Sequence, residues 1–263
     1  MPADWMNVSS LSFNTILLFE RVQLSWFPGW IPEKEFAVAL RANPHVEWYL
    51  RHKCPELNEW LDKVTSREDG NQPSNPEIRQ AEMEILKTVN DLVVYVVSPD
   101  VYDSQPFLKW NPDELTSLID FSGKRVIDIG SGTGKLALIA ASKAKAVYAV
   151  EPVANLRIYL KKRTMELGLN NVFVVDGLIQ DIPFADDFAD ITIGGFVFGE
   201  HPDEELREMM RVTKPCGTVI LCPGNTDSDN DKHDFLIGKG FEWSQFKEPG
   251  VRPVRKYWKK VRP

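Results

Sequence analysis

The chain has 263 residues, 43% of them hydrophobic and 26% charged, which is enough for one substantial core and an additional segment. Its 31 Lys and Arg against 38 Asp and Glu give a formal net charge of -7, which argues against a general nucleic-acid binder. Its three cysteines, Cys54, Cys216 and Cys222, have no zinc-site spacing and are odd in number, so we expect no metal, no disulfide framework and a reducing cytoplasmic location.

The N-terminal part of the chain is predicted to be mainly helical. Its first eighteen residues contain no Lys or Arg, and no apolar run reaches membrane-spanning length, so we expect neither export nor membrane insertion. Prolines separate three short helical patterns, at Glu33–Arg41, His45–Lys53 and Glu56–Val64. The polar residues 67–76 predict a linker or a mobile loop, and a further helical face follows with Ile78, Ile85 and Leu92.

Five of the eight tryptophans lie in this helical part, at positions 5, 26, 30, 48 and 60. Such large apolar side chains must pack against something. They serve either the core and a domain interface or a cap over a substrate pocket. We expect residues 1–115 to form this helical segment and residues 116–263 to form a second domain.

From Lys124 onward, short apolar runs alternate with helical patterns, which is typical of a parallel α/β sheet covered on both faces. The predicted strands are Arg125–Ile129, Ala146–Val150, Asn171–Val175, Ala189–Ile193 and Thr218–Cys222, and the predicted helices are Lys135–Ser142, Val153–Leu167 and Asp203–Val212. Two final runs, Phe241–Phe246 and Lys256–Lys260, are predicted to pair antiparallel at the sheet edge around a turn at Pro249 and Gly250. The fold class is therefore α/β, with a doubly wound, mostly parallel, seven-stranded sheet.

A cluster of basic residues near the C-terminus contrasts with the acidic chain; it comprises Arg252, Arg255, Lys256, Lys259, Lys260 and Arg262. The cluster either holds a phosphate or an acidic ligand, or forms the solvated face of an edge strand, where Lys and Arg discourage association between sheets.

The first predicted strand runs directly into a glycine-rich loop, Asp128-Ile129-Gly130-Ser131-Gly132-Thr133-Gly134, and a helix follows. Glycines allow a ligand to approach the backbone closely. A phosphate-binding P-loop is excluded because that motif needs Ser or Thr after its lysine, whereas Leu136 follows Lys135, and it needs a glycine where this chain has Ile129. A dinucleotide fingerprint is excluded because its third glycine would fall at position 135, where this chain has Lys.

The stretch VIDIGSGTG instead resembles the first motif of the class I S-adenosylmethionine-dependent methyltransferases. The resemblance implies a Rossmann-like sheet that binds S-adenosyl-L-methionine and releases S-adenosyl-L-homocysteine. It implies that the loop of Gly130, Ser131, Gly132 and Gly134 wraps the methionine end of the cofactor, while Asp128 steadies the loop and reaches the amino group through water. The resemblance covers roughly residues 120–224.

Glu151, at the end of VYAVE, matches the acidic residue with which this family binds both ribose hydroxyls. It follows Gly130 by twenty-one positions, as one strand-helix-strand unit requires for reaching the same ligand. The stretch DGLIQDIPFADDFADITIG resembles the family's adenine loop, so Gly177, Leu178 and Ile179 are expected to line the base. The usual acidic contact to the adenine amino group is absent there, and Asp176, Gln180 or Asp181 remain as substitute partners.

Methyl transfer from a sulfonium is an in-line displacement in which positioning supplies much of the acceleration. A base near the methyl group helps if the acceptor must lose a proton, and the loop after the fourth strand, from Gly194 to His201, is the place to look. Gly194 is expected at the cofactor, with Glu200 and His201 as catalytic candidates, His201 foremost because imidazole titrates near neutral pH. The competing interpretation is that His201 only caps the helix that begins at Pro202.

The segment YDSQPFLKW precedes the sheet domain, and in this family such a segment often folds over the cofactor. We therefore expect Tyr102, Phe107 and Trp110 to belong to a lid. Relatives that methylate amino groups of DNA carry an Asn-Pro-Pro-Tyr type motif where this chain has Gly194-Gly195-Phe196-Val197. Methylation of DNA amino groups is therefore not expected. The expectation is a methyltransferase acting on a small molecule; the alternatives are an RNA or protein methyltransferase and a non-catalytic cofactor-binding scaffold for a partner protein. The oligomeric state is not predicted.

Overall fold

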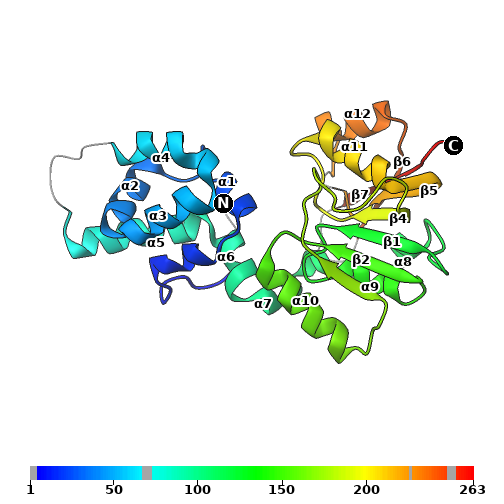
Figure 1. The fold of residues 1–263 in the computed structure, drawn as a ribbon, viewed down its shortest axis with the longest axis horizontal. Coiled ribbons are helices and arrows are strands. Elements are labelled where there is room, and N and C mark those ends of the chain that lie inside the picture. Colours follow the sequence, from blue (N-terminus) through cyan, green and yellow to red (C-terminus); the bar gives the residue numbers. More distant parts are fainter. Residues whose placement is uncertain (1–4, 67–72, 225–226, 248–252) are drawn as a thin grey trace. The chain divides into compact units, whose positions relative to one another are not determined.

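The structure is a computed structural model that describes residues 5–66, 73–224, 227–247 and 253–263. The chain divides into two compact units, Met1–Tyr102 and Asp103–Pro263 (Figure 1). The division falls inside the short helix α7 (Pro99–Asp103), so residues 103–115, grouped with the helical segment from sequence, lie in the second unit. No helix in these described ranges is both long and apolar enough to cross a membrane.

The N-terminal unit is helical, as predicted. Its elements are η1 (Phe13–Leu18), α1 (Arg21–Ser25), α2 (Glu33–Ala42), α3 (Pro44–Lys53), η2 (Pro55–Leu57), α4 (Asn58–Thr65), α5 (Asn75–Thr88), α6 (Asn90–Val97) and α7. Pro44 and Pro55 stand at the first positions of their elements, where a missing N–H costs nothing. The predicted linker 67–76 lies largely outside the described residues, and α5 begins within it at Asn75.

Phenylalanines, and not the tryptophans, fill the core of the N-terminal unit. Phe13, Phe19, Phe27 and Phe36 are at most 1% exposed and meet edge to face, with ring centroids 5.9 to 6.5 Å apart. Trp60 stacks on Phe36 at 5.6 Å, whereas Trp48 is 61% exposed. Each of the five tryptophans of this unit keeps part of its surface exposed. The tryptophans therefore border the core.

The second unit contains the predicted sheet. Its elements are η3 (Pro106–Leu108), α8 (Asp113–Thr116), β1 (Arg125–Ile129), α9 (Lys135–Ala141), β2 (Ala146–Val150), α10 (Ala154–Glu166), β3 (Val172–Val175), β4 (Ala189–Gly194), α11 (Pro202–Val212), β5 (Thr213–Leu221), α12 (Asp231–Gly238), β6 (Glu242–Phe246) and β7 (Val254–Lys260). The strand order is β3-β2-β1-β4-β5-β7-β6; β1 to β5 are parallel to one another, and β7 pairs antiparallel with both β5 and β6. The expectation of a mostly parallel, seven-stranded, doubly wound sheet is confirmed.

Alternate residues of β1, β2 and β5 face two apolar layers, as the pleat requires. One face packs against α8, α9 and α10 through side chains that include Val126, Leu136 and Leu160. The opposite face packs against α11 and α12 through Ile127, Met209 and Leu236, and Figure 1 shows these two helices on one side of the sheet. Because β1 to β5 are parallel, their carboxyl ends and following loops meet at one edge of the sheet.

The C-terminal basic cluster is not the solvated face of an edge strand. Strand β7 lies between β5 and β6, so β6 forms the edge. Arg255 and Lys256 are 8% and 6% exposed, and they project to opposite faces of the sheet. Lys256 Nζ donates to the carboxylate and the backbone carbonyl of Glu114, at 2.7 Å each, and Arg255 Nη2 donates to Asp229 at 2.7 Å. Arg252 and the predicted turn at Pro249 and Gly250 lie outside the described residues.

Candidate active site

The glycine loop leaves β1 in a conformation that requires glycine. Gly130, Gly132 and Gly134 have φ values of 63, 54 and 96°, in the left-handed region that other residues rarely adopt. A Cβ at Gly130 would lie 2.6 Å from Cγ2 of Val197, and a Cβ at Gly134 would collide with the side chain of Leu160 on α10. The loop is therefore packed between the chain that follows β4 and helix α10.

Glu151 joins this loop to the end of β2. Its carboxylate accepts a hydrogen bond from the Gly132 N–H at 2.8 Å and one from the Val153 N–H at 2.9 Å. The side chain is buried, and burial raises the pKa of the carboxyl from 4.5 to about 7. A carboxylate has about four acceptor positions, so these two bonds leave acceptor capacity for a ligand.

Two polar side chains beside the loop are buried with no partner in the described part of the chain. Asp128 is fully buried in β1, and within the described residues neither its carboxylate oxygens nor the hydroxyl of Ser131 makes a hydrogen bond of ordinary geometry. Burial raises the pKa of Asp128 well above its usual range; the nearby backbone N–H of Ala137 opposes this rise, and the charge of Glu151 adds to it. Because a buried polar group without a partner costs free energy, this pair fits a site completed by water or by the donors of a polar ligand.

The loop after β3 lies beside the end of β2, where Glu151 stands. Arg157 Nη1 donates to the backbone carbonyl of Glu151 at 2.7 Å and to the carboxylate of Asp176 at 2.9 Å, which ties the ends of β2 and β3 together. A Cβ at Gly177 would lie 2.8 Å from Cγ1 of Val150 and 2.7 Å from Cδ of Pro183. The neighbouring side chains diverge, because Leu178 is 37% exposed whereas Ile179 is buried in the α11 face of the sheet.

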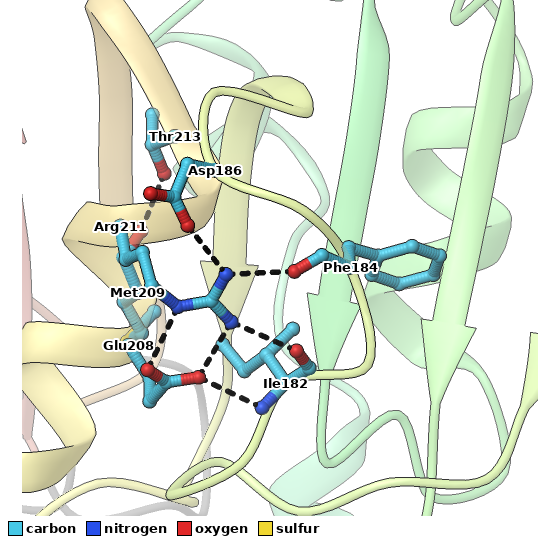
Figure 2. Close-up of polar contacts among 7 residues, drawn as sticks. All are labelled: Ile182, Phe184, Asp186, Glu208, Met209, Arg211 and Thr213. Carbon is cyan, nitrogen blue, oxygen red and sulfur yellow. Dashed lines mark hydrogen bonds and ion pairs between the residues drawn. The ribbon is translucent and has the colours of Figure 1, made fainter.

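Three buried or half-buried residues of α11, all missed from sequence, hold the loops on either side of β4. The carboxylate of Glu205, 0% exposed, accepts the N–H groups of Gly199, Glu200 and His201 at 2.5, 3.0 and 2.7 Å. Glu208 and Arg211 form an ion pair at 2.7 Å that binds the loop before β4 (Figure 2). The signal available in the sequence was the run PDEELREMMR, in which two acids fall next to the apolar positions Leu206 and Met209.

The loop after β4 contacts the glycine loop. Val197 packs where a Cβ on either Gly130 or Gly194 would stand, so these two predicted glycines face the same side chain. Glu200 and His201 are exposed at the start of α11. His201 occupies the N-cap position, but its side chain makes no capping hydrogen bond, and its backbone carbonyl accepts the Glu205 N–H at 3.0 Å. The imidazole is therefore not used to cap the helix.

The predicted lid aromatics have three different environments. Tyr102 ends the N-terminal unit, where its ring lies 4.8 Å from that of Tyr95. Phe107 meets Phe196 of the β4 loop edge to face at 5.7 Å. Trp110 is 3% exposed and belongs to the core on the α9 side of the sheet. Of the three, Phe107 contacts a loop of the candidate site.

Cys222 lies at this edge of the sheet as a buried thiol. Cys222 follows β5 directly and is buried, and burial raises the pKa of its thiol to about 12, so it stays protonated at neutral pH. In the portion of the chain that the structure describes, no three His, Cys, Asp or Glu residues gather as metal ligands would.

Known proteins are similar to the part of the chain that contains these loops. Residues 127–221 match the sequence model of the family described as "Methyltransferase domain". Demethylmenaquinone methyltransferase of Halalkalibacterium halodurans is 33% identical over 132 residues, which are 48% of this chain and 54% of that protein. The chloroplastic 2-methyl-6-phytyl-1,4-hydroquinone methyltransferase of Arabidopsis thaliana is 32% identical over 101 residues, 37% of this chain and 29% of that protein.

The chain therefore spans about half the length of the first of these relatives. Among solved structures, a SAM dependent methyltransferase from Aquifex aeolicus superposes with a TM-score of 0.51 at 19% identity, covering 62% of this chain and 96% of that one. This likeness bears on the fold alone. The family match, residues 127–221, runs from β1 to the end of β5 and so includes the loops between these strands.

Proposed function

We propose that this chain, whose residues 127–221 match the methyltransferase-domain family, is a class I S-adenosylmethionine-dependent methyltransferase that transfers the methyl group of S-adenosyl-L-methionine to a small-molecule acceptor. The observation that supports the proposal most strongly is the pair of unpartnered buried groups, Asp128 and Ser131, beside the glycine loop in the described structure. An ammonium group supplies the donors that such a carboxylate lacks.

The residues present fit each part of this cofactor. The backbone of the glycine loop and the Asp128 carboxylate would hold the methionine end. Glu151 has acceptor capacity left for the two ribose hydroxyls after bonding Gly132 and Val153. Gly177 and the exposed Leu178 would line the adenine, beside the end of β2; the side chain of Ile179 is buried in the core on the α11 face, so only its backbone would take part. Gly194 would approach from β4, where its missing side chain leaves room for Val197.

The sulfonium of the bound cofactor supplies an activated methyl group and its own leaving group. What the chain must add is the alignment of the acceptor, because an in-line displacement depends on geometry. The loop after β4 is suited to this task, since Glu205 fixes three consecutive N–H groups of residues 199–201. His201, whose imidazole is not used to cap α11, is our first candidate to accept a proton from the acceptor, with Glu200 as the second.

The acceptor is proposed to be a small organic molecule, because the relatives named above are methyltransferases of a demethylmenaquinone and of a phytyl hydroquinone. The residues matched by the family lie in the second unit, and we assign selection of the acceptor to segments outside that match. Phe107, which packs against Phe196 of the β4 loop, is the lid residue best placed for this role.

A labelling experiment tests the proposed function. The purified chain is incubated with methyl-labelled S-adenosyl-L-methionine and a small-molecule fraction, a protein fraction or an RNA fraction of a cell extract. Label is expected in the small-molecule fraction, and much less is expected with a Glu151→Ala variant. Label confined to RNA or protein would refute the acceptor class, and no binding of the cofactor by the folded protein would refute the function as a whole.

A further inference from the structure

Arg211, in the last turn of α11, holds the loop that precedes β4 with its whole guanidinium group (Figure 2). Its Nη1 donates to the carbonyl of Phe184 at 2.7 Å and to Oδ1 of Asp186 at 2.9 Å. Its Nη2 donates to the carbonyl of Ile182 at 2.9 Å and to Oε2 of Glu208 at 2.7 Å, while Nε donates to Oε1 of Glu208 at 2.8 Å. One side chain thereby fixes two backbone carbonyls of the loop.

Glu208 completes this arrangement from the same helix. Its Oε2 accepts the N–H of Ile182 at 3.1 Å, so Ile182 is held at both its N–H and its carbonyl. The backbone carbonyl of Arg211 also accepts the N–H of Asp187 at 2.9 Å. The forked pairing of Arg with a carboxylate has a fixed planar geometry, which a lysine in the same place does not reproduce.

The clamped residues lie next to the proposed nucleoside site. Pro183 stands between the two clamped carbonyls, and its ring lies where a side chain on Gly177 would stand. Gly177 in turn abuts Val150, the residue before Glu151. Contacts therefore connect Arg211 through Pro183 to Gly177. Gly177 lies beside the end of β2, which Glu151 follows.

We infer that Arg211, held by Glu208, is a positioning residue for cofactor binding: it sets the place of residues 177–184 against the end of β2 and so shapes the pocket for the nucleoside half of the ligand. This inference rests on the proposed function. The loop is also anchored by apolar packing, since Ile179 and Ile182 are buried with Met209 and Val212. If that packing alone set the loop, loss of the guanidinium would lower stability and leave ligand affinity unchanged.

The test compares Arg211→Lys and Arg211→Gln with a matched control, Lys214→Gln. Like Arg211, Lys214 makes an ion pair next to β4, with Asp190 of that strand at 2.8 Å. Unlike Arg211, Lys214 lies at the amino-terminal start of β5, at the sheet edge away from the glycine loop. Calorimetric titration with S-adenosyl-L-homocysteine is carried out on each protein at a temperature at which circular dichroism shows it folded. Hydrogen exchange of residues 178–184 is followed in the same samples.

Arg211→Gln is expected to weaken binding of S-adenosyl-L-homocysteine at least tenfold, and Arg211→Lys three- to tenfold, with faster exchange in the 178–184 loop. Lys214→Gln is expected to bind within twofold of the unaltered chain, even where its thermal midpoint falls. A folded Arg211→Lys variant that binds as the unaltered chain does overturns the inference, and this variant decides the matter if Arg211→Gln does not fold. Failure of the unaltered chain to bind refutes the proposed function, a result distinct from unchanged affinity in the Arg211 variants.

Discussion

Replacing Glu151 by Gln should make the ligand-free protein less sensitive to pH. The carboxyl of Glu151 is buried and bonded to two backbone N–H groups, yet burial still raises its pKa to about 7. The folded protein therefore binds a proton at this site more tightly than the unfolded chain does. Stability from this group is fully present below about pH 4.5 and is lost as the pH rises toward 7, where the folded protein must bury a charge.

The size of the effect follows from the two pKa values. The difference between 4.5 in the unfolded chain and about 7 in the folded protein corresponds to about 3 kcal/mol, of which about 2 to 3 kcal/mol falls between pH 5 and pH 8. A Gln side chain has no such titration. Most other titrating groups contribute equally in both proteins and cancel in the comparison. Asp128 is the exception: the charge of Glu151 helps to raise its pKa, so removing that charge adds to the difference in the same direction.

Urea unfolding of both proteins at pH 5 and pH 8, without ligand, measures this difference. The unaltered protein should lose about 2 to 3 kcal/mol more than Glu151→Gln between the two pH values. A difference below about 1 kcal/mol, or one of opposite sign, would refute the reasoning that the Glu151 carboxylate is held at a desolvation cost in the absence of ligand.

Three further predictions concern the neighbouring residues. Glu151→Ala should weaken binding of S-adenosyl-L-methionine at least tenfold in calorimetry, because charge-assisted bonds are worth about 1.5 to 3 kcal/mol each, and equal affinity would remove this residue from the site. Gly134→Ala should cost more free energy of unfolding than Gly168→Ala, since both glycines have positive φ but only the first would collide with Leu160; equal losses would contradict the tight packing of the loop. Glu205→Gln should speed hydrogen exchange of the Gly199, Glu200 and His201 amides about five- to hundredfold. This range corresponds to the cost of about 1 to 3 kcal/mol for leaving a buried polar group unsatisfied. Unchanged exchange would show that other contacts hold the loop.

The central part of the sheet was predictable because its strands are buried on both faces. The apolar runs at Arg125–Ile129 and Ala146–Val150 coincide with β1 and β2, and the glycine loop follows β1 as expected. Strand β5 was predicted too short. It begins at Thr213, across an irregularity that contains Cys216 with φ 63°, and this departure from regular alternation hides the start of the strand in the sequence.

Long-range charge pairs were not predictable from the pattern. Glu205 reads as an ordinary acid in the first turn of a helix, where it interacts favourably with the helix dipole, and Glu208 reads as an ordinary acid further along the same helix. Only the fold shows that Glu208 lies against the loop before β4 and Glu205 against the loop after it. The interpretation of the basic C-terminal run as the solvated face of an edge strand was wrong for the same reason. Its two buried members are paired with Asp229 and Glu114, which lie 26 and 142 residues away in the sequence.

A crystal structure of this chain grown with S-adenosyl-L-homocysteine tests the proposed cofactor site most directly. We expect the ligand's amino group beside Asp128 and Ser131, both ribose hydroxyls on the carboxylate of Glu151, and the base against residues 177–179. Continuous density for the ligand elsewhere, or an empty edge at β1 and β2 in protein saturated with it, would contradict the central claim that these loops form one cofactor site.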